Sequence, residues 1–219
     1  MSGKSGPRMA DDVLRLCLDT HLLVALKFNK RSTPRSQSIG PDSHYETSSY
    51  FLMDCIENGG NETAVIQMVV SLGMLDDMAD SLESLGFRKE SAMAIADGMA
   101  GMAQSGPKLE EVHLVLGGTG LMALGHSQQT ALETALAGRA HVLATNAVSS
   151  YVTEQTHAEV LERSERRGVD LAEVAIYSSA DRSVVIALPH KVARWLKDGI
   201  FPDAETIRAL YPGSPQLKP

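Results

Sequence analysis

The feature that most constrains the fold is a short apolar strand that ends at an acid. Residues 14–18 read Leu-Arg-Leu-Cys-Leu, and Asp19 and Thr20 separate them from an apolar run at helical spacing that begins at Leu22. This pattern predicts a buried, central strand of an α/β sheet. Ligands bind at the carboxyl edge of such sheets, because loops and helix amino termini meet there. Asp19 is therefore the first candidate site residue, and the structural alternative is a turn that caps a helix.

Two later apolar runs repeat this alternation of strand and helix. Residues 64–70 and 142–145 are short and apolar, and amphipathic segments separate them from the first strand. Strands that alternate with helices need crossover connections, which place the strands parallel to one another. The sequence therefore predicts an α/β protein, a three-layer α/β/α sandwich with a mainly parallel central sheet. In that sheet, residues 65–70 and 142–145 are expected to neighbour residues 14–18.

The remaining elements follow from helical spacing and from turn residues. Helices are expected over residues 49–58, 74–85, 89–103, 130–137, 153–168 and 189–196. A hairpin is expected over residues 173–186, with its turn at 179–181. The expected domain spans residues 13–210 and carries an extra helix and this hairpin at about 150–186. Residues 1–12 are expected to form a flexible leader, and residues 211–219 a flexible tail.

Composition narrows the class of protein. The chain has 219 residues, is 43% hydrophobic and has a formal net charge of −7. This charge argues against a nucleic-acid binder that works through bulk attraction, because phosphate binding needs clustered Lys and Arg. Cys17 and Cys55 are the only cysteines, which excludes a disulfide framework and predicts a cytoplasmic protein. No apolar run approaches the roughly 20 residues that cross a bilayer, so no membrane partner is expected.

Four stretches keep an order and spacing that point to a known family. The stretches are residues 14–20, residues 69–78 with Ser71 and Asp77, residues 131–146, and residues 184–196. Over residues 13–198 they resemble the PIN-domain family of metal-dependent ribonucleases, which includes the toxins of many bacterial toxin–antitoxin pairs. The order and spacing of the four stretches carry the resemblance, since each alone is common.

The resemblance implies a metal site at the strand ends. The family gathers three or four carboxylates around Mg²⁺ or Mn²⁺, and the metal positions water for attack on a phosphodiester. By position, Asp19 and Asp77 take the first two places and are the implied catalytic residues and metal ligands. The third place falls near Gln128, and the fourth falls at Asn146 or Ala147. Two acids are thus replaced by neutral residues, so Mg²⁺ or Mn²⁺ is expected to bind weakly or not at all.

The resemblance also implies a substrate and partners. The substrate would be single-stranded RNA, an antitoxin protein is an implied partner, and a homo-oligomer is expected. The candidate substrate-binding residues are Thr20, Ser71, Thr145, Arg31 and Arg35. Two functions remain open at this point: a Mg/Mn-dependent toxin-type ribonuclease with a reduced carboxylate site, and a catalytically inactive PIN-like module that binds RNA or protein.

A glycine-rich turn supports a different hypothesis. Residues 112–116 are an apolar strand, and Gly117-Gly118-Thr119-Gly120 follows it, similar to the dinucleotide-binding turn of short-chain dehydrogenase-like folds. Such glycines let a pyrophosphate approach a helix amino terminus. Against a dinucleotide-binding protein, the turn lies past the midpoint of the chain and no Tyr-x-x-x-Lys pair follows it. The structural alternative is a plain connection between helices.

Overall fold

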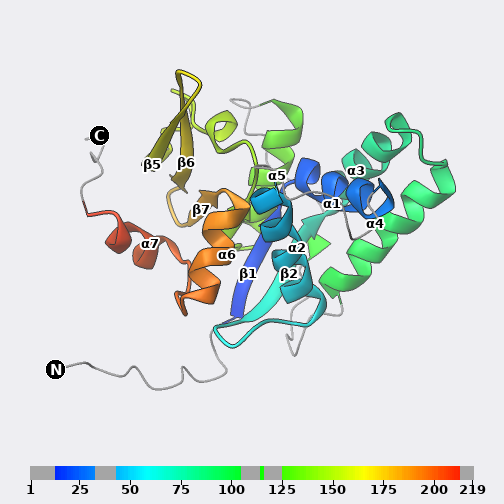
Figure 1. Ribbon diagram of the computed structural model, residues 1–219, viewed down its shortest axis with the longest axis horizontal. Helices are drawn as coiled ribbons and strands as arrows, with labels where there is room; N and C mark the ends of the chain where they lie inside the picture. The colour runs from blue at the N-terminus through cyan, green and yellow to red at the C-terminus, as the bar shows by residue number, and fades with distance from the viewer. Residues whose placement is uncertain (1–12, 33–42, 105–113, 116–124, 213–219) are drawn as a thin grey trace.

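The computed structural model describes residues 13–32, 43–104, 114–115 and 125–212, which form a mixed sheet flanked by helices (Figure 1). In this part of the chain the sheet has seven strands in the order β3-β2-β1-β4-β7-β6-β5. The parallel strands are β1 (Val13–Leu18), β2 (Val65–Ser71), β3 (Leu114–Val115), β4 (Val142–Ala144) and β7 (Ser183–Ala187). The antiparallel strands are β6 (Val169–Ser178) and β5 (Glu159–Arg166). The predicted α/β class with a mainly parallel sheet is confirmed.

The central place of β1 follows from burial on both of its faces. Leu16 pairs with Met68 of β2 on one side and with Val142 of β4 on the other, so both predicted neighbours are confirmed. Leu14, Leu16, Cys17 and Leu18 are all fully buried. Burying one leucine side chain contributes about 1.5–3 kcal/mol, which makes this short strand a main source of stability.

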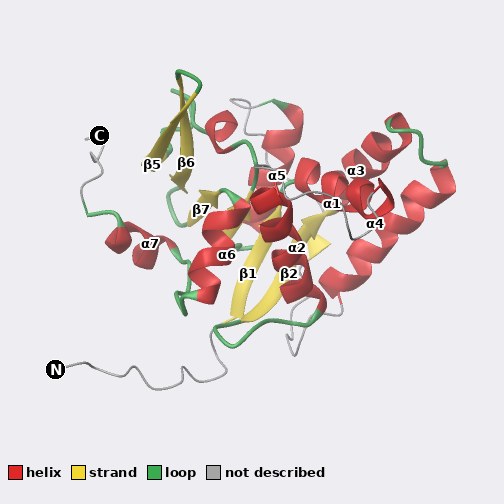
Figure 2. Ribbon diagram, in the orientation of Figure 1, coloured by secondary structure: helices red, strands yellow, loops and turns green. Residues whose placement is uncertain are grey.

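Helices cover both faces of the sheet (Figure 2). On the face of Cys17, its Sγ lies 3.9 Å from Ala131 O of α5 (His126–Ala137). Gln67 lies on the same face, and its Nε2 donates to Ala103 O at 2.6 Å, at the end of α4 (Lys89–Gln104). Figure 1 shows α2 (Ser43–Glu57) and α6 (Pro189–Lys197) side by side in front of the sheet. The remaining helices are α1 (Thr20–Ser32), α3 (Leu72–Ser84), the 3-10 turn η1 (Val148–Tyr151) and α7 (Ala204–Leu210).

Within the described ranges, no helix combines the length and the apolar character needed to cross a membrane. The helices predicted from spacing are present as α2, α3, α4, α5 and α6. Helix α2 begins at Ser43 and not at residue 49, α5 begins at His126 and not at residue 130, and the other ends differ by no more than two residues. Helix α7 was not anticipated. Asp203 caps it and accepts a hydrogen bond from the N–H of Thr206 at 2.8 Å.

The helix predicted over residues 153–168 is wrong, because residues 159–166 form β5, which pairs antiparallel with β6. A charged residue of this stretch forms an ion pair across the hairpin: Arg163 Nη1 of β5 lies 2.8 Å from Asp170 Oδ2 of β6. Lys191 of α6 fixes the hairpin to the body of the protein through Glu162, at 2.6 Å, and Glu173, at 3.0 Å. The hairpin predicted over residues 173–186 is confirmed as β6 and β7.

Candidate functional site

The candidate site lies at the carboxyl edge of the parallel strands. Strand β1 ends at Leu18, and the backbone N–H of Asp19 then donates to Ala144 O of β4 at 3.0 Å. Helix α1 begins at the next residue, Thr20. The sequence thus turns from strand to helix at Asp19, whose side chain is only 2% exposed. Burial of a carboxylate to this degree requires hydrogen bonds that compensate its lost hydration.

Three donors supply this compensation. Asp19 Oδ2 accepts hydrogen bonds from Thr145 Oγ1 at 2.7 Å and from the hydroxyl of Tyr151 at 2.8 Å. Its Oδ1 accepts a hydrogen bond from the backbone N–H of His21 at 3.1 Å. Thr145 follows β4 directly, and Tyr151 closes η1 and is fully buried. We call Asp19, Thr145 and Tyr151 the Asp19 cluster.

Tyr151 is held as a hydrogen-bond donor in this cluster. Burial raises the pKa of its hydroxyl well above the ordinary value, and the charge of Asp19 and its hydrogen bond raise it further. The hydroxyl therefore keeps its proton through the physiological range and donates a hydrogen bond to the carboxylate. Charge-assisted hydrogen bonds of this kind are roughly twice as strong as neutral ones.

Stability at alkaline pH tests this role of Tyr151. A group whose folded pKa is raised contributes stability that is fully present below its unfolded pKa and is lost as pH rises through the folded pKa. We expect the contribution of Tyr151 to the free energy of unfolding to fall above about pH 10, so the Tyr151→Phe variant should show a shallower fall there. Part of the fall is expected to remain and to begin at lower pH, because burial and the charge of Asp19 raise the pKa of Cys17. Burial and a hydrogen bond to Glu162 also raise the pKa of Tyr211. Urea titrations between pH 8 and pH 11 measure both slopes, and identical slopes would exclude the Asp19–Tyr151 bond.

A second hydrogen-bonded group lies at the end of β2. Ser71 caps α3 by accepting a hydrogen bond from the N–H of Met74 at 3.1 Å, and Thr134 Oγ1 of α5 donates to Ser71 Oγ at 2.7 Å. A Cβ added to Gly73 would lie 3.3 Å from Thr130 Cγ2, so the first turn of α3 lies close to α5. Helices α1 and α3 therefore begin at the same edge of the sheet, and α5 packs beside them.

The other predicted site residues differ in burial. Thr20 is buried, and its Oγ1 has no hydrogen-bond partner among the described residues. Asp77 is half-buried on α3, Gln128 is half-buried in the first turn of α5, and Asn146 is exposed. Arg31 lies on α1, but its side chain is outside the described part of the structure. Arg35 lies wholly outside the described residues.

The oxygen atoms of the described residues at this edge of the sheet do not form a site that fits a Mg²⁺ or Mn²⁺ ion. Within the described ranges, no three His, Cys, Asp or Glu side chains gather where they could hold a metal. Hard cations need several carboxylate or carbonyl oxygens with available lone pairs. Both oxygens of Asp19 already accept hydrogen bonds, and Glu133 Oε1, the buried acid of α5, accepts one from Gln129 Nε2 at 3.0 Å. A metal on Asp19 Oδ2 would have to displace Tyr151 or Thr145, and a metal on Oδ1 would have to share that oxygen with the backbone N–H of His21.

The strand order also bears on the glycine-rich turn. Residues 117–120 lie outside the described residues, but β3, which precedes them, is the outermost parallel strand. Dinucleotide-binding folds place their glycine turn after a strand at the point where the strand order reverses. In this sheet that point lies between β1 and β4. The carboxyl edge at Asp19 is therefore the better placed candidate.

Sequence reasoning missed Tyr151 as a partner of Asp19. The two residues are 132 positions apart, and no motif connects them. One signal was present: a large aromatic residue in the short stretch of mixed polarity that follows β4. In comparisons with known proteins, the chain matches no protein-family model, no curated protein and no solved structure.

Proposed function

We propose that this chain is a PIN-like protein that binds single-stranded RNA at the carboxyl edge of its sheet, and that Asp19 organises this edge and holds no metal. The observation that carries the proposal is the engagement of Asp19 by three donors, from His21, Thr145 and Tyr151, which occupy three of the roughly four lone-pair sites of its carboxylate. A catalytic carboxylate needs lone pairs that face a metal or water. Asp19 instead uses its lone pairs to fix the positions of β4 and η1 beside β1.

Helix amino ends supply the chemistry for phosphate contacts. The first N–H groups of a helix have no partner within the helix, and the helix dipole adds partial positive charge there. Leu72 and Gly73, in the first turn of α3, are exposed. Gly125 precedes α5 and provides no side-chain cap for its amides. Backbone donors of this kind bind phosphate without a basic patch, which suits a chain with a net charge of −7.

Asn146 adds a contact suited to unpaired bases. It is exposed at the end of β4, next to Thr145 of the Asp19 cluster. Its side-chain amide both donates and accepts hydrogen bonds, as recognition of the edges of splayed bases requires. Single-stranded RNA is therefore a better match for this edge than a duplex. The antitoxin partner, the homo-oligomer and the cytoplasmic location implied by the sequence remain predictions.

Binding and cleavage of a labelled single-stranded RNA test the proposal. With a fluorescent 12-nucleotide RNA, we expect a Kd of about 1–100 μM at physiological salt, and no cleavage in the presence of Mn²⁺. Asn146→Asp is expected to weaken binding roughly tenfold, because it places a negative charge at the edge. Gln104→Glu is the matched control, since it makes the same change of charge at an exposed position at the end of α4.

Each result has a definite meaning. Absence of binding by the wild type, or equal losses in the two variants, contradicts the proposal. Mn²⁺-dependent cleavage that Asp19→Asn abolishes would show the metal-dependent ribonuclease instead. If NAD(P) raises the melting temperature and Gly118→Val removes the rise, the glycine-rich turn at residues 117–120 binds a dinucleotide, because a ligand that binds only the native state stabilises it.

A further inference from the structure

A pocket of about 440 Å³ lies at the edge of the sheet opposite Asp19, where β4 and β7 begin. Its polar lining consists of Arg139, His141, Asp181, Arg182 and Ser183. Pockets of about 300–1,000 Å³ are typical of small-molecule sites. The pocket is therefore large enough for a small ligand, and its lining indicates the charge of that ligand.

Arg139 has a backbone conformation that favours glycine. Its φ is 53°, and it follows Gly138 at the end of α5. The N–H of Arg139 donates to Leu136 O at 3.1 Å, and that of Ala140 donates to Ala135 O at 2.7 Å, which completes a Schellman turn. Glycine usually occupies this place, because a side chain there costs free energy. The side chain of Arg139 is therefore held at the pocket at a cost in backbone free energy.

Arg182 is fixed at the wall of the same pocket. Its Nη1 donates to Leu136 O at 2.7 Å, and its Nε lies 3.4 Å from Asp181 Oδ2. The first contact places a positive charge over the negative end of α5. Arg139 and Arg182 bring two positive charges against the one negative charge of Asp181, whose side chain is 74% exposed. The pocket therefore has an excess of positive charge.

We propose that this pocket binds a phosphate monoester. Guanidinium groups present paired N–H donors that match the spacing of phosphate oxygens. The hydroxyl of Ser183 lies on the same wall. A phosphate monoester has three terminal oxygens and nearly two negative charges, so it can contact both guanidinium groups at once, whereas a carboxylate has two oxygens and one charge. This site is separate from the proposed RNA site, because it lies at the other edge of the sheet.

Calorimetric titration of the full chain in phosphate-free buffer tests the proposal, with phenyl phosphate and benzoate as ligands of similar size. We expect phenyl phosphate to bind roughly tenfold tighter than benzoate, because only the phosphate engages both arginines. Arg139→Gly is expected to weaken phenyl phosphate binding roughly tenfold. Its melting temperature should not fall, since glycine fits the backbone conformation at this position.

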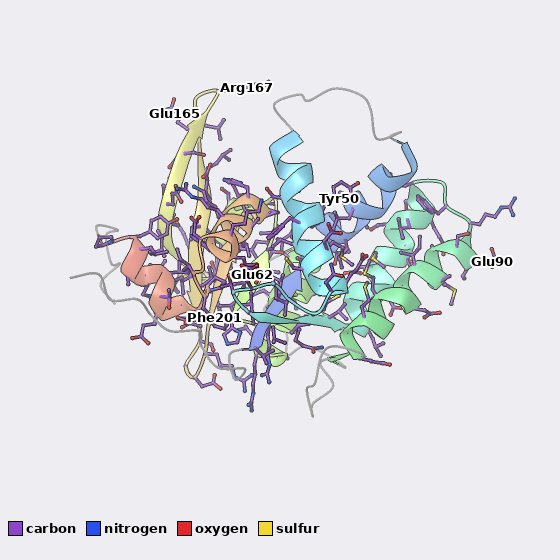
Figure 3. The ribbon with its side chains drawn as sticks, turned by 60° about the horizontal axis from the view of Figure 1, so that its bottom comes forward. Tyr50, Glu62, Glu90, Glu165, Arg167 and Phe201 are labelled. Atoms are coloured by element: carbon purple, nitrogen blue, oxygen red, sulfur yellow. The ribbon has the colours of Figure 1, made fainter. Side chains whose placement is uncertain are left out.

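Arg167→Gly is the matched control. Arg167 also has a φ of 53° and is exposed, but it lies at the tip of the β5–β6 hairpin, far from the pocket (Figure 3). This variant loses the same charge and the same backbone strain, and its phenyl phosphate affinity is expected to equal that of the wild type. Three results would overturn the proposal: no binding by the wild type, equal binding of benzoate, or equal losses in both variants. RNA affinity is expected to stay unchanged in Arg139→Gly, so the two sites are tested independently.

Discussion

Replacement of Asp19 by alanine is expected to lower the free energy of unfolding by about 3–5 kcal/mol. Asp19 is 2% exposed, and the hydroxyl groups of Thr145 and Tyr151 both donate to its Oδ2. Without the carboxylate, two buried hydroxyls lose their acceptor, and each unsatisfied group costs about 1–3 kcal/mol. Urea unfolding followed by circular dichroism measures the loss. Asp19→Asn is expected to cost less, because an amide oxygen in the place of Oδ2 still accepts hydrogen bonds from both hydroxyls.

The direction of the change in unfolding free energy in Asp19→Ala separates a structural carboxylate from a catalytic one. Removing an acid from a strained active site commonly leaves stability unchanged or raises it, since like charges there repel one another. Asp76→Ala is the control, because Asp76 is exposed on α3. Its change is expected to stay within about 0.5 kcal/mol. A loss below about 1 kcal/mol in Asp19→Ala would contradict the bonding of the Asp19 cluster.

Gly60→Ala is expected to cost about 3–5 kcal/mol, because both backbone strain and a steric clash oppose it. Gly60 has a φ of 138°, and a Cβ there would lie 2.4 Å from Ala64 O and 2.9 Å from Val65 Cα. This turn joins α2 to the start of β2. It also attaches to α6, because Thr63 Oγ1 donates to Leu196 O at 2.6 Å. A shift of the turn would therefore disturb the sheet and one helical layer together.

Two other glycines serve as controls for Gly60. Gly98 lies inside α4 with open space at its Cβ position, so Gly98→Ala is expected to stabilise the protein by about 0.5–1 kcal/mol. Gly86 has a φ of 88° but no neighbouring atom within 4 Å, so Gly86→Ala should cost only the strain, about 1 kcal/mol. Thermal or urea unfolding of the three variants ranks them by their change in the free energy of unfolding. If Gly60→Ala costs no more than Gly86→Ala, the close approach to Ala64 does not exist.

The parallel core could be predicted from the sequence because its strands are buried on both faces. Residues 14–18, 65–70 and 142–145 are apolar runs for this reason, and their order in the sheet follows from crossover connections. Strand β5 could not be predicted in this way. It is an edge strand with charged residues along its length, and Glu and Arg three or four positions apart also suit an exposed helix.

The candidate site could be predicted only where it lies at strand ends. Thr145 ends up beside Asp19 because parallel neighbouring strands finish at the same edge. Tyr151 comes from a 3-10 turn beyond β4, whose path no local pattern specifies. The positions of Asp77, Gln128 and Asn146 were carried over from the family resemblance alone. Their exposure depends on how α3, α5 and the loop after β4 pack, which periodicity does not determine.

A crystal grown or soaked with Mn²⁺ tests the central claim most directly, because Mn²⁺ scatters anomalously and suits the oxygen ligands that Mg²⁺ prefers. The bonding of Asp19 to His21, Thr145 and Tyr151 predicts no anomalous peak beside this carboxylate, and both hydroxyl donors in place. An anomalous peak at coordinating distance from either Asp19 oxygen, about 2.2 Å, would contradict the claim and show that the edge holds a metal.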